Sequence, residues 1–124
     1  MVGYIADIEE LTANNNNFRQ VLYTGKHAQL VIMSLLPGEE LGSEVHANVD
    51  QFFRLESGVL KIIMNGEENT LTDGMAAIVP SGTTHNVINI GTVTAKLYTL
   101  YSPPNHPEGT VHATKVEADA AEHH

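Results

Sequence analysis

Short runs of β-branched and aromatic residues alternate with turn-forming residues from Phe18 to Tyr101, and this alternation limits the possible folds more than any other feature of the sequence. No part of this region repeats with the 3.6-residue period of an amphipathic helix. The clearest turn signal is Asn65-Gly66, a pair that accepts the positive φ angles of a type I′ hairpin turn at little cost. The pattern predicts an all-β protein.

Eight short strands are expected, and their close spacing implies a sandwich or a barrel. They cover residues 18–23, 28–36, 51–56, 59–64, 68–71, 75–79, 85–89 and 93–101. The polar run Asn14 to Asn17 predicts a loop before the first of them. After the last, Pro103-Pro104 cannot continue a central strand, so we expect an irregular tail whose Ala- and Glu-rich end, residues 116–122, forms a short helix.

The length of 124 residues is enough for one hydrophobic core. We therefore expect a single domain over residues 1–124, with a barrel core at about 18–101 and a tail at 102–124. Hydrophobic residues make up 42% of the chain and charged residues 17%, which is typical of a globular rather than a disordered protein.

The formal net charge is −9, from 6 basic and 15 acidic residues. Nucleic acids and anionic membranes bind to basic surfaces, so we expect neither as a partner. The N-terminus lacks the basic and apolar regions of a signal peptide, and the longest apolar stretch, Leu30 to Leu36, is interrupted by Ser34. These features favour a cytoplasmic location. His123 and His124 are either the natural end or the remnant of a purification tag, and we exclude them from the site.

The chain has no cysteine, so any metal ion must be held by nitrogen and oxygen ligands. Residues two apart share one face of a strand, so Glu44 and His46 point the same way, and Gln51 follows on the next strand. His85 follows a turn that begins at Pro80. If the strand that begins at His85 lies beside the others, two imidazoles, one carboxylate and one amide converge on a site for a divalent metal.

The spacing of these residues resembles that of the cupin superfamily. Its first motif, G(X)5HXH(X)3,4E(X)6G, fits in every interval, and its second, G(X)5PXG(X)2H(X)3N, fits in every fixed position. The first motif runs through Gly38, Glu44, His46, Gln51 and Gly58, and the second through Gly74, Pro80, Gly82, His85 and Asn89. The resemblance is to small single-domain cupins of the Cupin_2 and mannose-6-phosphate isomerase-like branch. It implies a double-stranded β-helix, also called a jelly-roll barrel.

The metal ligands depart from the family pattern. Glu44, His46, Gln51 and His85 stand where the family usually has His, His, Glu and His. The negative charge is kept but moved from the third ligand position to the first. Two histidines and one carboxylate suit Fe2+ with open positions for substrate or oxygen, although Zn2+, Mn2+ or Ni2+ would also fit. A purely structural interpretation stands beside this one, in which the histidines are hydrogen-bonded core residues and Gln51 is a satisfied polar group or orients a water molecule or substrate.

Histidines of the tail are further candidates. His106 and His112 belong either to a solvated surface segment or to a lid that folds over a barrel mouth, its own or a partner's, and contributes a proton-transfer group. Tyr98 and Tyr101 are three residues apart in one strand, so at most one of them lines the lumen.

Other side chains are assigned by the alternation along each strand. An apolar lumen lining is expected from Met33, Phe53, Ile63 and Met75. Phe52 points to the opposite face from Gln51, where it favours sheet packing or a dimer contact. The cations are expected to face mostly outward, which disfavours a sugar phosphate as substrate. They are Arg19, Arg54, Lys61 and Lys96.

The resemblance implies a metal-dependent enzyme that acts on a small, mostly uncharged organic molecule in the barrel lumen, and a homodimer. Two reaction classes remain open. In an oxygenase, the metal binds substrate and oxygen, whereas in an isomerase or lyase it polarises a carbonyl while a base, such as Glu44 released from the metal, moves a proton. The alternative is a non-catalytic cupin that binds or senses a small ligand.

Overall fold

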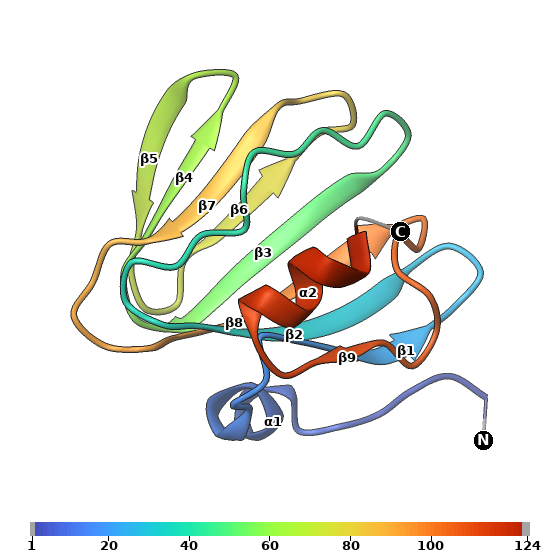
Figure 1. The fold of residues 1–124 in the computed structure, drawn as a ribbon. Helices are drawn as coiled ribbons and strands as arrows, with labels where there is room; N and C mark the ends of the chain where they lie inside the picture. The colour runs from blue at the N-terminus through green and yellow to red at the C-terminus, as the bar shows by residue number, and fades with distance from the viewer. Residues whose placement is uncertain (1, 123–124) are drawn as a thin grey trace.

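A computed structural model describes residues 2–122 and shows a chain made mostly of antiparallel strands with two short helices (Figure 1). The elements, in chain order, are α1 (Ile8–Asn14), β1 (Arg19–Thr24), β2 (Gln29–Leu35), β3 (Asp50–Ser57), β4 (Leu60–Met64), β5 (Glu67–Leu71), β6 (Ala76–Val79), β7 (His85–Asn89), β8 (Ala95–Ser102), β9 (Val111–His112) and α2 (Lys115–Glu122). All eight expected strands are present, and among the strands of residues 2–122 only β9 was not predicted.

The strands form two sheets that face each other across the core (Figure 1). The larger sheet has the order β6-β3-β8-β2-β1-β9, and the smaller has the order β5-β4-β7. Every strand pair is antiparallel. The fold is the predicted double-stranded β-helix, closed by a short C-terminal helix.

The predicted Asn-Gly turn joins β4 to β5. Asn65 has φ of 49° and Gly66 has φ of 83°, the positive values that a type I′ turn requires. The turn brings Met64 opposite Glu67 and so fixes the register of the hairpin. A second glycine, Gly58, has φ of 118°, and a Cβ atom there would lie 3.0 Å from Ala95 Cα. The glycine that ends the first motif is therefore required by a close approach of two backbones.

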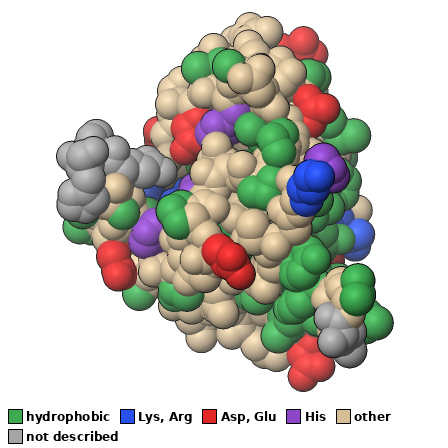
Figure 2. All heavy atoms as spheres, turned by 90° about the vertical axis from the view of Figure 1, so that its right-hand side faces the viewer, with side chains coloured by type: hydrophobic (Ala, Val, Ile, Leu, Met, Phe, Trp, Pro, Cys, Tyr) green, Lys and Arg blue, Asp and Glu red, His purple; other side chains and the backbone are tan. Residues whose placement is uncertain are grey.

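Apolar side chains from both sheets fill the core. Leu55 and Leu97 come from the larger sheet and Leu60 and Ile62 from the smaller, and all four are fully buried. Acidic side chains are scattered over the face that Figure 2 shows rather than gathered into one patch.

The predicted lumen positions of Ile63 and Met75 are wrong. Leu60 and Ile62 take the inward positions of β4, so Ile63 lies on the other face and is only half-buried. Ile62 and Ile63 are both apolar, and the sequence therefore left the inward phase of this strand ambiguous. Met75 belongs to the turn before β6, is 45% exposed, and accepts hydrogen bonds from the Thr72 backbone and hydroxyl. Met33 and Phe53 are fully buried, as expected.

The helix α1 was not foreseen, although its start carries a recognisable signal. The side chain of Asp7 accepts a hydrogen bond from Glu10 N at 3.1 Å, which makes Asp7 the N-cap of the helix. The helix packs on the outer face of the larger sheet (Figure 1). Its last residue, Asn14, is helical, so the predicted polar loop starts at Asn15.

The tail adds both a strand and a helix to the barrel. Val111 and His112 form β9, in which His112 pairs with Arg19 of β1. The helix α2 begins one residue before the predicted range, and its Ala118 is buried in the core cluster. Among residues 2–122, no helix is long and apolar enough to cross a membrane.

Candidate metal centre

The backbone brings the two cupin-like motifs together. Glu44 N donates to His85 O and His85 N donates to Glu44 O, both at 2.8 Å, so these residues form a directly opposed antiparallel pair. A third bond of 2.8 Å runs from Gly82 N to His46 O. Because opposed residues in such a pair project to the same side, the side chains of Glu44 and His85 share one face. The segment that carries Glu44 and His46 therefore lies along the edge of β7.

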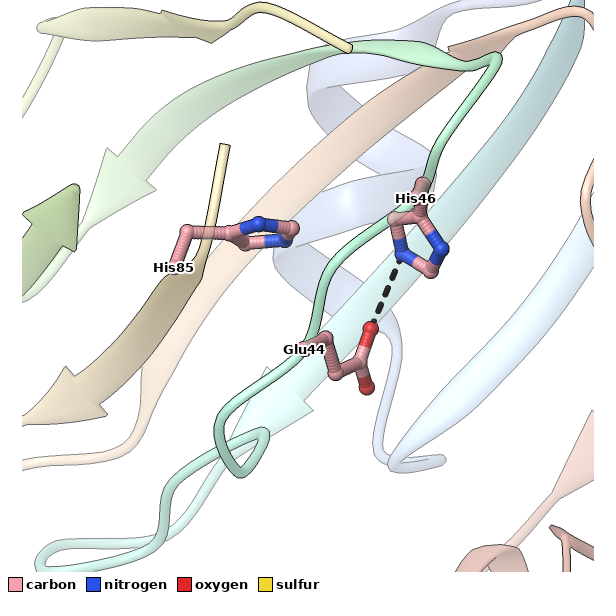
Figure 3. A group of neighbouring side chains, drawn as sticks. All are labelled: Glu44, His46 and His85. Carbon is pink, nitrogen blue, oxygen red and sulfur yellow. Dashed lines mark ion pairs between the residues drawn. The ribbon is translucent and has the colours of Figure 1, made fainter. Parts of the chain in front are cut away.

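Glu44, His46 and His85 point toward one another (Figure 3). Each of them offers one ligand atom, and these three atoms lie within 4.8 Å of one another. His46 Nε2 is 3.0 Å from Glu44 Oε2, and the two imidazole rings are 5.5 Å apart between centroids. Ligands about 2.0 to 2.2 Å from one ion lie roughly 3 to 4 Å from each other, so small side-chain adjustments would seat a metal here.

Two polar atoms of the centre are buried and unpaired. Within the described part of the chain, His85 Nε2 and Gln51 Oε1 have no hydrogen-bond partner, and the contact of His46 Nε2 is the 3.0 Å approach to Glu44 Oε2. Buried polar atoms without a partner cost free energy, and such atoms in a native site call for a ligand or water. The donor set therefore fits a bound metal ion.

A hydrogen bond to the backbone orients the ring of His85 toward the other ligands. Its Nδ1 lies 3.0 Å from Thr83 O, which can only accept, so Nδ1 carries the hydrogen and donates. In the neutral ring, Nε2 then has a free lone pair directed into the site. A backbone carbonyl that fixes the tautomer in this way is typical of metal-binding histidines.

Gln51 is the fourth predicted site residue and lies on β3 with 1% of its surface exposed. Its Nε2 donates to Thr99 Oγ1 at 3.1 Å, which sets the orientation of the amide. The oxygen is consequently left as the unpaired end. An amide oxygen can bind a metal ion, although it is a weaker ligand than a carboxylate.

Charges around Glu44 keep its carboxyl ionised. Burial raises the pKa of this carboxyl, but the contact with His46 and the nearby Arg19 guanidinium outweigh burial and leave the pKa below its usual value of 4.5. An ionised carboxylate is the form that a metal ion needs.

Arg19 corrects the expectation that the cations face outward. It is 2% exposed, because it shares the inward face of β1 with buried Val21. Its Nη1 lies 3.4 Å from His112 Nδ1, and its guanidinium carbon lies 5.3 Å from the centre of the Phe18 ring. The sequence signal was Val21, an apolar residue two positions after Arg19 that shares its strand face. However, polar and apolar residues alternate too weakly along this strand to show which face is buried.

The tail histidines lie beside the barrel interior. His106 Nε2 is 3.1 Å from the hydroxyl of Tyr101, which is 1% exposed, and the Tyr101 ring stands edge-on to His46 at 6.0 Å between centroids. Tyr98 points to the opposite face, where it packs against Phe52. Of the two tyrosines, Tyr101 is therefore the one that lines the lumen.

Burial also acts on His106, and it lowers the pKa of the imidazole from 6.5 to about 4, with a smaller contribution from the positive charge of Arg19. The ring is accordingly neutral at pH 7. A neutral imidazole can either donate or accept through Nε2, depending on its tautomer.

An open hollow of about 430 Å³ lies elsewhere, between α1 and the outer face of the larger sheet. It is lined by residues such as Leu11, Asn14 and Ile32, and no described residue of the predicted site borders it. The clustered ligands, rather than this surface hollow, define the candidate site.

Comparison with known families identifies the fold class and then the family. The barrel with two opposed sheets is that of a double-stranded β-helix protein. The Cupin_2 family (cupin domain) matches residues 31–101, more than half of the chain, and the protein belongs to this family. The resemblance found in the two motifs is thereby confirmed.

Two relatives are similar in sequence. The uncharacterized protein YrkC of Bacillus subtilis (strain 168) is 49% identical over 125 residues, which cover 96% of this chain and 67% of YrkC. The uncharacterized protein L612 of Acanthamoeba polyphaga mimivirus is 40% identical over 112 residues, which cover 87% of this chain and 70% of L612.

Two solved structures share the fold. The crystal structure of BH2720 from Bacillus halodurans has a TM-score of 0.93 and 41% identity, and the match covers 94% of this chain and 93% of that one. The crystal structure of TT1209 from Thermus thermophilus has a TM-score of 0.71 and 27% identity, with 80% and 96% covered. The chain is thus a cupin that brings together a group of side chains able to hold a metal ion.

Proposed function

We propose that this cupin is a metal-dependent enzyme that acts on a small organic molecule in the barrel lumen. One divalent transition metal ion is held by Glu44, His46 and His85, with Gln51 as a weaker fourth contact. The observation that carries the proposal is the convergence of Glu44, His46 and His85, whose ligand atoms lie within 4.8 Å of one another, with His85 Nε2 and Gln51 Oε1 buried and unpaired among the described residues. A barrel built only for stability would pair these atoms or replace them with apolar groups.

Fe2+ is the metal that we favour, because two histidines and one carboxylate are the ligand set of many non-haem iron sites with open positions. Zn2+, Mn2+ and Ni2+ are the alternatives. When bound, the ion would supply Lewis acidity and, in the case of iron, redox chemistry with oxygen.

The chain's own residues would hold and surround the substrate. Phe53 lies 6.4 Å from the His85 ring between centroids and is fully buried, so the site has an apolar wall. Tyr101 supplies a polar group on another side. Glu44 is 23% exposed in its side chain, and once released from the metal it would serve as a base in an isomerase or lyase, where it would take a proton from substrate carbon.

Metal analysis of the purified protein tests the proposal. We expect about one equivalent of transition metal per chain in the wild type and close to none in the His46→Ala, His85→Ala double variant. His27→Ala is the matched control, since His27 is exposed at the β1–β2 turn and should change nothing. All samples keep His123 and His124, so any contribution of the terminal pair cancels. Equal metal content in the wild type and the double variant would falsify the assignment.

Oxygen consumption separates the reaction classes. Iron that consumes oxygen in the presence of candidate organic substrates supports an oxygenase. Retention of zinc without oxygen uptake supports an isomerase or lyase, and a tightly retained, unchanged small molecule supports the ligand-binding alternative.

A further inference from the structure

A row of directly opposed residues crosses the smaller sheet, starting at the metal centre. It contains, in order, Glu44, His85 of β7, Met64 of β4 and Glu67 of β5. Opposed residues of antiparallel strands project to the same face of a sheet, so Met64 lies on the face that carries Glu44 and His85. Met64 packs against the buried core cluster, which confirms that its side chain points inward.

The backbone hydrogen bonds bring Met64 close to His85. The N–H and the C=O of His85 both bond to Glu44, and Asn65 N donates to Thr84 O at 2.8 Å. Met64 and His85 are therefore a pair that shares no backbone hydrogen bond. In such pairs the Cα atoms are only about 4.5 Å apart and the side chains are closest. The Met64 side chain thus lies beside the His85 imidazole, on the side away from Glu44.

Exposure to solvent increases along this row. His85 is 3% exposed, Met64 is half-buried and Glu67 is exposed. The two inward residues that precede Met64 on β4, Leu60 and Ile62, are fully buried. The loss of burial at Met64 indicates that the barrel opens to solvent at this end of β4, with the Met64 side chain between the solvent and the metal centre.

We infer that Met64 is a specificity-determining residue of this site, against which the apolar part of a metal-bound ligand packs. The inference rests on the proposed metal at Glu44, His46 and His85. It deepens the proposed function by naming the ligand class, a small molecule in which one metal-binding oxygen group is joined to a short apolar chain.

The chemistry of the side chains around His85 favours this class. Phe53, whose ring centre lies 6.4 Å from that of His85, supplies a second apolar surface there. Neither Phe53 nor Met64 carries a charge, so each recognises a ligand by burying apolar area. A methionine side chain is flexible and polarisable, and it adapts to apolar groups of different shapes.

Binding of acetate and butyrate to the cobalt-loaded protein tests the inference, because these probes share a carboxylate and differ by two methylene groups. The visible absorption of Co2+ reports binding. We expect the wild type to bind butyrate about tenfold more tightly than acetate, since one fully buried methylene group contributes up to about fourfold. Met64→Gln, which keeps the length of the side chain but makes it polar, should reduce this ratio to about threefold. Met64→Leu should keep the ratio near the wild-type value.

Ile63→Gln is the matched control. Ile63 is the apolar neighbour of Met64 on β4, is also half-buried and lies on the other face of the sheet. Its replacement should leave the affinities for both carboxylates unchanged. All variants should bind one equivalent of Co2+, and circular dichroism checks the fold of each.

Oxidation of methionine by hydrogen peroxide gives a second measurement on the wild-type sequence, so it decides the question even if Met64→Gln does not fold. Peroxide transfers one oxygen atom to the thioether sulfur, which becomes a sulfoxide, and the remainder leaves as water. In the zinc-loaded protein, saturating butyrate should slow sulfoxide formation at Met64 by about threefold or more, because the bound chain covers the sulfur. Met75, which is 45% exposed in the turn before β6, is the internal control and should react equally fast with and without butyrate. Mass spectrometry of the peptides measures both rates.

The outcomes separate the two levels of the proposal. If the wild type binds no Co2+, the proposed function fails and the inference fails with it. If Co2+ binds but the ratio of the two affinities is the same in wild type and folded Met64→Gln, or butyrate does not slow the oxidation of Met64, the metal site stands and the Met64 inference is overturned. Failure of both carboxylates to bind the cobalt-loaded wild type would also overturn it, because the metal would not accept a ligand of this class.

Discussion

The two ends of the larger sheet bury their side chains equally well, but the buried side chains are apolar at one end and polar at the other. At one end, Leu55 and Leu97 are opposite each other and fully buried. At the other end, Gln51, Tyr101 and Gln29 form a row across three strands, with no more than 1% of any of them exposed. Burial alone therefore does not distinguish the core from the site, whereas the chemistry of the buried atoms does.

The hydrogen bonds of two buried side-chain amides show a further difference. Asn89 of β7, in the smaller sheet, is 1% exposed, and its Nδ2 donates to Leu35 O at the apolar end of the larger sheet and to Val93 O, at 2.9 Å each, while its Oδ1 accepts from Gly91 N. Gln51, at the polar end, pairs only its nitrogen among the described contacts. The same fold completes the hydrogen bonds of one buried amide and leaves the other incomplete. Incomplete bonding at Gln51 is what a ligand site requires.

The largest effect is expected at the apolar end. Leu55→Ala should lower the free energy of unfolding by about 3 kcal/mol, because it leaves a cavity in a fully packed core. Urea denaturation of the metal-free protein measures this change. The metal content of the folded variant should equal that of the wild type. A drop in metal content larger than the drop in folded fraction would show that the two ends are coupled.

Metal binding should stabilise the polar end by a comparable amount. At a free metal concentration about 100 times the dissociation constant, the wild type should gain about 2.7 kcal/mol of unfolding free energy. Glu44→Ala should gain much less at the same metal concentration, because the only carboxylate of the triad is lost. Thermal melts with and without chelator measure the gain. An equal gain in both proteins would place the metal somewhere else.

The tail between β8 and β9 makes stability depend on pH through His106. Its pKa is about 4 when folded and 6.5 when unfolded, so between these values the unfolded chain binds more protons. Stability should therefore fall as the pH is lowered from 6.5 to about 4, by about 2 kcal/mol for this half-buried ring.

Urea denaturation at several pH values compares wild type with His106→Gln, which lacks this titration. Glu44 loses stability in the same direction as the pH falls, because its folded pKa is also lowered, but Glu44 is present in both proteins and its contribution cancels. Parallel curves for the two proteins would contradict the burial of a neutral His106.

The smallest effect has the opposite sign. Gln51→Met should leave the metal-free protein as stable as the wild type or up to about 1 kcal/mol more stable, since an unpaired buried oxygen is replaced by an apolar group of similar size. Thr99 loses one partner, which limits the gain. Denaturation in the presence of chelator measures the difference. A loss above about 2 kcal/mol would mean that Gln51 serves the core rather than the site.

Local signals were sufficient for most of the fold. The Asn65-Gly66 turn fixed one hairpin, and the punctuation by Gly, Pro and Asp indicated all eight expected strands. The inward phase of a strand was less certain where neighbouring residues were both apolar, as at Ile62 and Ile63. The buried face of a strand can be predicted only where apolar and polar residues alternate, and Ile62 and Ile63 are both apolar.

The site was predictable only in part for a different reason. The intervals of the two motifs proposed Glu44, His46 and His85, which the structure brings together, because the segment between β2 and β3 that carries Glu44 and His46 bridges to the start of β7. The placement of Arg19 and His106 depends on contacts between distant parts of the chain, namely the pairing of β1 with β9 and the hydrogen bond from His106 N to Gln29 Oε1. No local pattern reports such long-range contacts. The homodimer and the cytoplasmic location stay predictions.

A crystal structure of the metal-loaded protein, with anomalous diffraction measured at the absorption edge of the bound metal, tests the metal centre most directly. We expect one anomalous peak within about 2.0 to 2.2 Å of His46 Nε2, His85 Nε2 and a Glu44 carboxylate oxygen. Water molecules that fill the site of a fully metal-supplemented crystal, or a peak bound by other residues, would contradict the metal centre described above.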